Sequence, residues 1–105
     1  MAPRWVFPIV AALTLAMPVS ADAATVQITM ENLVISPAEA SAKVGDTIEW
    51  INKDIFIHTA TARNGDWDVT MPPKKTVTLV LKKAGLIDYY CRFHPNMKAT
   101  LEVAP

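Results

Sequence analysis

Residues 76–103 read T-V-T-L-V-L-K-K-A-G-L-I-D-Y-Y-C-R-F-H-P-N-M-K-A-T-L-E-V, and they give the strongest indication of the fold. Residues 76–81 and 87–91 are rich in β-branched and aromatic side chains, and a turn containing Gly85 separates them. Residues 99–103 alternate between apolar and polar side chains. Short runs of this kind, bounded by turn residues, are typical of β-strands. The stretch therefore predicts three successive strands.

The same pattern continues toward the N-terminus. Further strands are expected at 25–30, 40–44 and 47–52, with residues 33–35 continuing the first strand after a kink and residues 56–61 of mixed character. Turn residues recur about every 8–12 residues, and no long stretch has helical periodicity. The sequence thus predicts an all-β fold, an antiparallel sandwich or barrel of seven or eight strands. Trp50 is expected in its core.

The first 23 residues have the layout of a secretory signal peptide. Arg4 precedes an apolar stretch, and small residues then allow cleavage after Ala21 or Ala23. A membrane anchor is the alternative, but the apolar stretch is short for a span and is broken by Pro8 and Pro18. We therefore expect an exported, periplasmic protein, not membrane-bound in its mature form, with one domain at residues 24–105.

The size and charge of the mature chain exclude several classes of partner. From Asp22 onward there are 9 Lys and Arg residues and 10 Asp and Glu residues, so the chain has no excess of positive charge that would attract nucleic acid. A domain this small has a thin core and commonly needs a disulfide or a metal. Cys91 is the single cysteine, so no disulfide can form within one chain.

Cys91 can be read as a buried inert thiol, a nucleophile or a metal ligand. His94 and Met97 follow it at intervals of three, with Pro95 stiffening the connection. Given two histidines and five methionines in 105 residues, this spacing arises by chance about once in a thousand sequences. Each residue taken singly has a structural explanation. The group together, joined by His58 from the end of another strand, predicts a metal centre.

The donor set selects the metal. Two imidazoles, a thiolate and a thioether suit a mononuclear type 1 (blue) copper site, with the methionine as a weak axial ligand. Zinc accepts cysteine and histidine but seldom a thioether, and calcium and magnesium require oxygen ligands. The C-x-x-H pattern is not the C-x-x-C-H of haem attachment.

The chain resembles the cupredoxins, most closely the amicyanin, plastocyanin and pseudoazurin group. The resemblance lies in V-G-D-T-I-E-W-I-N-K-D at 44–54, in His58, and in A-G-L-I-D-Y-Y-C-R-F-H-P-N-M at 84–97. It implies a Greek-key sandwich with one copper ion at one pole. It also implies strong ligation by His58, Cys91 and His94, and weak ligation by Met97.

The resemblance further implies outer-sphere transfer of one electron between Cu(I) and Cu(II). His94 would present its edge inside an apolar patch, formed here by Phe93 and Pro95 with Met71, Pro72 and Pro73. Redox proteins would dock there on a monomer, in amicyanin an amine dehydrogenase and a c-type cytochrome. Family members commonly carry Asn after the first histidine, whereas this chain has Thr59, so a looser site or a shifted potential is expected.

Three functions follow from this reading. An electron carrier is favoured. A copper chaperone or copper store is the alternative, but the chain has no Met-rich or His-rich tract. An enzyme is not expected, because a thiol nucleophile would want an orienting group beside its base and a multicopper oxidase needs more than two histidines.

Overall fold

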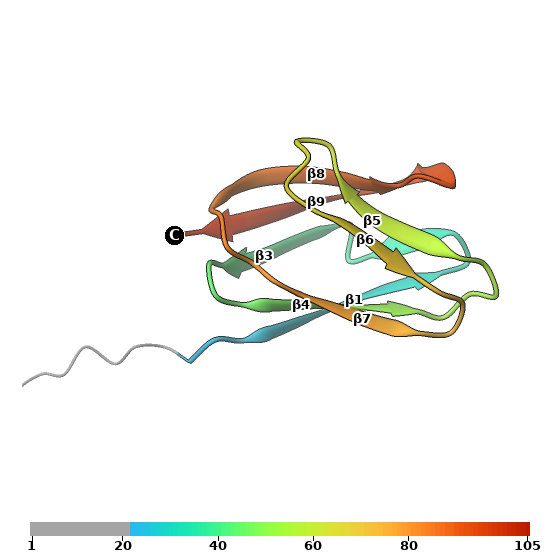
Figure 1. Ribbon diagram of the computed structural model, residues 1–105, viewed down its shortest axis with the longest axis horizontal. Helices are drawn as coiled ribbons and strands as arrows, with labels where there is room; N and C mark the ends of the chain where they lie inside the picture. Colours follow the sequence, from blue (N-terminus) through green and yellow to red (C-terminus); the bar gives the residue numbers. More distant parts are fainter. Residues whose placement is uncertain (1–21) are drawn as a thin grey trace, which may run out of the picture.

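Alternating apolar residues become the inward faces of nine β-strands in the computed structural model, which describes residues 22–105 (Figure 1). The predicted signal peptide lies, up to residue 21, outside the described residues. Within residues 22–105 no helix forms, and hence none that could span a membrane. The strands are β1 (Thr25–Glu31), β2 (Val34–Ser36), β3 (Glu39–Lys43), β4 (Thr47–Asn52), β5 (His58–Ala62), β6 (Asp68–Met71), β7 (Thr76–Val80), β8 (Gly85–Cys91) and β9 (His94–Ala104).

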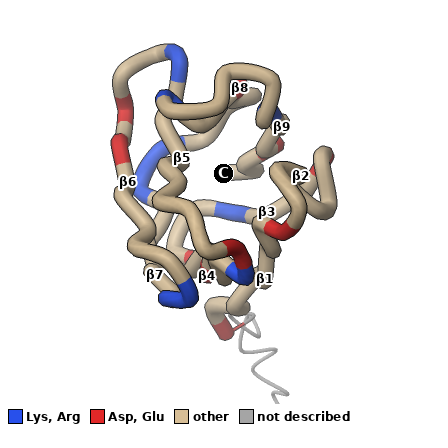
Figure 2. Tube along the Cα trace, turned by 90° about the vertical axis from the view of Figure 1, so that its right-hand side faces the viewer, with Lys and Arg blue, Asp and Glu red and all other residues tan. Residues whose placement is uncertain are grey.

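Two sheets pack face to face, in the orders β2-β1-β4-β7 and β3-β9-β8-β5-β6. Figure 2 looks along the strands and shows β7, β4 and β1 on one side of the interior and β5, β8 and β9 on the other. The predicted all-β sandwich is confirmed. Residues 22–105 form nine strands rather than the predicted seven or eight. Both sheets are mixed rather than antiparallel throughout, because β1 runs parallel to β4 and β3 runs parallel to β9.

Three local predictions differ from the structure. Residues 33–35 do not continue the first strand, because Asn32 and Leu33 adopt positive φ angles of 53° and 62° and turn β2 back antiparallel to β1. The edge strand β6 was not predicted, since Asp68–Met71 is short and partly polar. The last strand begins at His94 rather than at residue 99, so the candidate ligands His94 and Met97 lie on β9 itself.

Large inward-facing side chains from both sheets fill the core. Trp50, fully buried as predicted, lies with its ring centroid 5.3 Å from Trp67 and 5.8 Å from Tyr89. Its indole N–H donates to the Tyr89 hydroxyl over 3.4 Å. Burial raises the pKa of Tyr89 to about 12, against the opposing effect of this hydrogen bond. This aromatic group joins β4 to β8 across the sandwich.

The buried carboxylate of Asp46 ties Ala24, the residue before β1, to the β3–β4 turn. It accepts hydrogen bonds from the amides of Ala24 (2.8 Å) and Lys43 (3.0 Å). These bonds hold the pKa of the Asp46 carboxyl below its ordinary value. The ionised Asp46 carboxylate therefore contributes its full stabilisation of the folded state above the unfolded-state pKa of about 3.9. This contribution is lost as the pH falls through the lower pKa of the folded state.

We expect Asp46→Asn to lower the free energy of unfolding at neutral pH and to weaken the loss of stability on acidification, because a neutral amide has no depressed pKa. Urea unfolding of the copper-free protein at about pH 7 and about pH 3 measures both effects. Glu102→Gln, at an exposed position on β9, is the control. An Asp46→Asn protein as acid-sensitive as the control would contradict this role.

Candidate metal centre

Three of the four candidate ligands meet at one end of the sandwich. His58 begins β5, Cys91 ends β8 and His94 begins β9, paired with Cys91 across a two-residue turn. In Figure 1 the β4–β5 loop and the β8–β9 turn both lie at the right-hand end. The Nδ1 atoms of His58 and His94 are each 3.7 Å from the Cys91 Sγ atom. The predicted convergence of these residues is therefore present in the fold.

The spacing of the three donor atoms fits a single metal ion. All three lie within 4.8 Å of one another. An ion bonded at about 2.0 Å to nitrogen and about 2.3 Å to sulfur, with ligands about 120° apart, would separate nitrogen from sulfur by about 3.7 Å. His58 and Cys91 are fully buried, while His94 is half-buried. The donor set is thus preformed, and one imidazole reaches toward the surface.

Met97, the fourth candidate, lies three residues beyond His94 on β9. Its side chain is 2% exposed and belongs to the hydrophobic core. The burial pattern of β9 changes from exposed at Pro95 and Asn96 to buried at Met97, so the thioether faces inward.

Asp54, which the sequence reading missed, holds the first histidine. Its Oδ2 atom is 2.7 Å from His58 Nε2, so Nε2 donates its hydrogen to the carboxylate while Nδ1 faces the sulfur. The carboxylate also accepts from the amides of Asn32 (2.6 Å) and Leu33 (3.1 Å). Burial raises the pKa of the Asp54 carboxyl, but these hydrogen bonds outweigh it and hold the pKa below its ordinary value.

A sequence signal for Asp54 exists. It is the acidic residue four positions before His58, and the three residues between them are all apolar. Asn52 supports the same loop: its side-chain nitrogen lies 2.8 Å from the carbonyl oxygen of Phe56 and 3.2 Å from that of Met71. The loop that carries the first histidine is therefore fixed by buried polar contacts.

Thr59 connects the two ligand-bearing segments. Its backbone N–H donates to Cys91 Sγ over 3.3 Å. Its hydroxyl oxygen accepts from the Arg92 amide over 2.9 Å. Although Thr59 is shorter than the asparagine common in the family, its side chain does bridge β5 to the turn after Cys91.

A family model described as a cupredoxin-like domain matches residues 5–103. The chain belongs to the cupredoxin-like family. The resemblance noted at residues 44–54 and 84–97 is thereby confirmed. This cupredoxin is 31% identical to methylamine utilization protein MauL from Methylorubrum extorquens over 93 residues, which are 85% of this chain and 80% of MauL.

Solved amicyanins share the fold of this cupredoxin. The amicyanin of Paracoccus versutus matches with a TM-score of 0.65 at 27% identity, covering 82% of this chain and 85% of that one. A Cu(I) structure of an amicyanin variant matches with a TM-score of 0.66 at 25% identity, covering 75% of this chain and 81% of that one.

An apolar surface adjoins the half-buried histidine of this cupredoxin. Phe93, on the β8–β9 turn, is 50% exposed, and the Phe56 ring centroid lies 5.9 Å from that of His94. Ile55 and Ile57 flank Phe56 and are also exposed. The sequence reading missed this contribution from the β4–β5 loop. Met71, also expected in this patch, is instead fully buried: it is the cross-strand partner of the buried His58, and both side chains lie on the inward face of the sheet.

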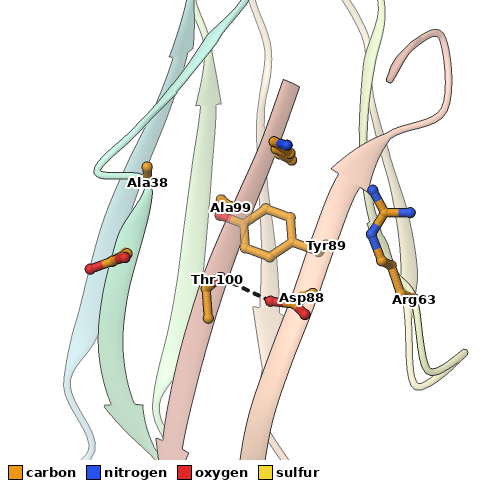
Figure 3. Close-up of a pocket in the computed structure, with 8 residues that line it drawn as sticks. Ala38, Arg63, Asp88, Tyr89, Ala99 and Thr100 are labelled. Atoms are coloured by element: carbon orange, nitrogen blue, oxygen red, sulfur yellow. Dashed lines mark hydrogen bonds between the residues drawn. The ribbon is translucent and has the colours of Figure 1, made fainter. Parts of the chain in front are cut away.

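A hollow lined mainly by residues of β3, β8 and β9 is separate from the candidate metal centre (Figure 3). Within it Thr100 donates a hydrogen bond to Asp88 over 2.9 Å, and Figure 3 draws this bond between β9 and β8. Its lining residues are Ala38, Glu39, Arg63, Asp88, Tyr89, Lys98, Ala99 and Thr100. They include none of the four candidate ligands.

Proposed function

We propose that this cupredoxin is an exported carrier of single electrons, holding one copper ion through His58, Cys91, His94 and Met97. The observation that carries the proposal is the 3.7 Å approach of both histidine Nδ1 atoms to Cys91 Sγ. Two imidazoles and one thiolate with a nearby thioether favour copper over zinc. The similarity to an amicyanin solved with Cu(I) supports the same metal.

Bound copper would supply the chemistry, the exchange of one electron between Cu(II) and Cu(I). The chain supplies rigidity. Asp54 fixes the tautomer and orientation of His58, and the Thr59 amide holds Cys91 Sγ. Because buried contacts hold these donors, their positions change little between oxidation states, and little reorganisation opposes the transfer. We propose a carrier and not an enzyme, because the relatives that the chain resembles include amicyanins.

Electrons would enter and leave through His94. Its imidazole is half-buried and contacts the exposed Phe56, so a partner docking on this apolar surface comes close to the centre. We propose redox proteins as the partners of a monomeric carrier. The relative MauL is named for methylamine utilization, and we propose an amine dehydrogenase as donor and a c-type cytochrome as acceptor. Stopped-flow oxidation of the reduced protein by such a cytochrome tests this step.

Export is the proposed role of residues 1–23. Their sequence pattern supports cleavage after Ala21 or Ala23, which releases the domain at residues 24–105 into the periplasm. Mass spectrometry of the protein from a periplasmic extract tests the assignment. Recovery of the full chain from the membrane fraction would contradict it.

Absorption and EPR spectra of the mature protein after addition of Cu(II) test the metal assignment. We expect a strong band near about 600 nm from thiolate-to-copper charge transfer, with narrow copper hyperfine splitting. An ordinary cupric spectrum would overturn the type 1 site and favour the copper-chaperone alternative. Preferential binding of zinc would point to a site built for another metal.

We expect Met97→Leu to retain copper and raise the reduction potential. Loss of the thioether leaves a more apolar site, which favours Cu(I) over Cu(II). A tenfold gain in relative Cu(I) affinity corresponds to about 59 mV for one electron, and we expect a rise of that order. Redox titration followed at the visible band measures it. An unchanged or lower potential would argue against Met97 as axial ligand.

A further inference from the structure

A hydrogen-bonded circuit runs from the cysteine sulfur to the protein surface. It starts at Thr59, which is fully buried and whose amide donates to Cys91 Sγ. The Thr59 hydroxyl lies 2.9 Å from the hydroxyl of Thr61, and Thr61 donates to Asp68 Oδ1 over 2.8 Å. The Arg92 side chain returns to the same oxygen through Nε at 3.3 Å. Since the Arg92 amide also donates to Thr59, the circuit is closed.

The carboxylate gives the circuit a direction. An ionised Asp68 can only accept, so the Thr61 hydrogen points to it. The hydrogen between the two hydroxyls must then come from Thr59, whose oxygen remains free to accept from the Arg92 amide. Asp68 thereby orders both threonine hydroxyls, although its side chain is 51% exposed.

The circuit joins the elements that carry the ligands. Thr59 and Thr61 lie on β5, which begins at His58, and Thr61 pairs with Asp68 across the β5–β6 ladder. Arg92 is the first residue of the turn between Cys91 and His94. An isolated surface ion pair contributes little to stability. The Arg92–Asp68 pair differs, because its acceptor oxygen Asp68 Oδ1 also accepts from Thr61. The hydrogen bonds of Thr61 and Thr59 then continue to the Arg92 amide in the β8–β9 turn.

We propose that Asp68 is a positioning residue for the copper site, acting through Thr61 and Thr59 on the turn that holds Cys91 and His94. This inference rests on the proposed copper function. Without the Asp68 carboxylate, the Thr61 hydroxyl can rotate and donate to the Thr59 oxygen. It then competes with the Thr59 hydroxyl to be the donor of the bond between them. The bond to the Arg92 amide then loses its fixed geometry, and the turn that would hold Cys91 and His94 against bound copper becomes less well ordered.

The test compares Asp68→Ala and Thr61→Val with Asp66→Ala, an aspartate in the β5–β6 turn whose salt bridge to Lys83 leads away from the site. In the copper-loaded proteins, Asp68→Ala and Thr61→Val should shift the reduction potential in the same direction and broaden the EPR hyperfine lines. The double variant should shift no further than either single variant, because both break one circuit. Asp66→Ala and the conservative Thr61→Ser should match the wild type.

Amide exchange in the copper-free protein gives a readout that does not depend on the metal. The Arg92 amide should exchange about tenfold faster in Asp68→Ala and Thr61→Val, consistent with the loss of one ordered hydrogen bond. This measurement stands even if the wild type fails to form a blue site, which would overturn the copper function alone. An Asp68→Ala protein equal to Asp66→Ala in potential, EPR and exchange would overturn the positioning role. Additive shifts in the double variant would do the same.

Discussion

Replacement of Cys91 by serine is expected to abolish the blue colour completely. The visible band of a type 1 site comes from thiolate-to-copper charge transfer, and a serine hydroxyl supplies no such donor at neutral pH. Cys91 Sγ is the atom that both histidine Nδ1 atoms approach at 3.7 Å, so its loss removes the centre of the donor set. We expect the band to fall to background rather than to shift.

Absorption and EPR spectra of the copper-loaded variant measure this effect. His58 and His94 remain, so any residual Cu(II) should give the wide hyperfine splitting of an ordinary cupric site. Met97→Leu, which keeps the thiolate, is the matched control and should stay coloured. Far-UV circular dichroism excludes unfolding as the cause. A Cys91→Ser protein that remained blue would refute the assignment of the sulfur ligand.

Trp50→Ala is expected to cause the largest loss of stability. Trp50 is fully buried and packs against Trp67 and Tyr89, so truncation leaves a cavity between the two sheets and an unpaired Tyr89 hydroxyl. Truncation of a buried tryptophan costs about 3–5 kcal/mol, against a total stability on the order of 5–15 kcal/mol for a native domain. A large part of the copper-free protein should therefore lose its cooperative fold.

Urea unfolding of the copper-free protein gives the free energy, because bound copper would add its own stabilisation by mass action. Trp50→Phe keeps an aromatic ring and should lose much less. Val80→Ala, at a residue 50% exposed on β7, should be close to neutral. If Trp50→Ala cost no more than Val80→Ala, the aromatic group would not be a central part of the core.

The outcome for individual strands shows where sequence reading succeeds. Residues 47–52 alternate cleanly, and β4 has the predicted bounds. Alternation directly reflects which side chains face the core, so strands with one buried face can be predicted from the sequence. β6 was not predicted, because an edge strand pairs with a neighbour on one side only and tolerates polar residues such as Asp68. The β1–β2 turn was not predicted, because its positive φ angles fall on Asn32 and Leu33 rather than on glycine.

The all-β class, the buried Trp50 and the candidate donors Cys91, His94 and Met97 could be predicted from the sequence, because each of these features depends on alternation or spacing between residues that are close in the chain. Three further features become visible only in the folded chain: Asp54 holds His58, the β4–β5 loop adds Phe56 to the surface beside His94, and Asp68 reaches the Cys91 turn through two threonines. The contacts that create the centre join separate strands, and the packing of the two sheets, rather than any local pattern, decides which strand ends meet.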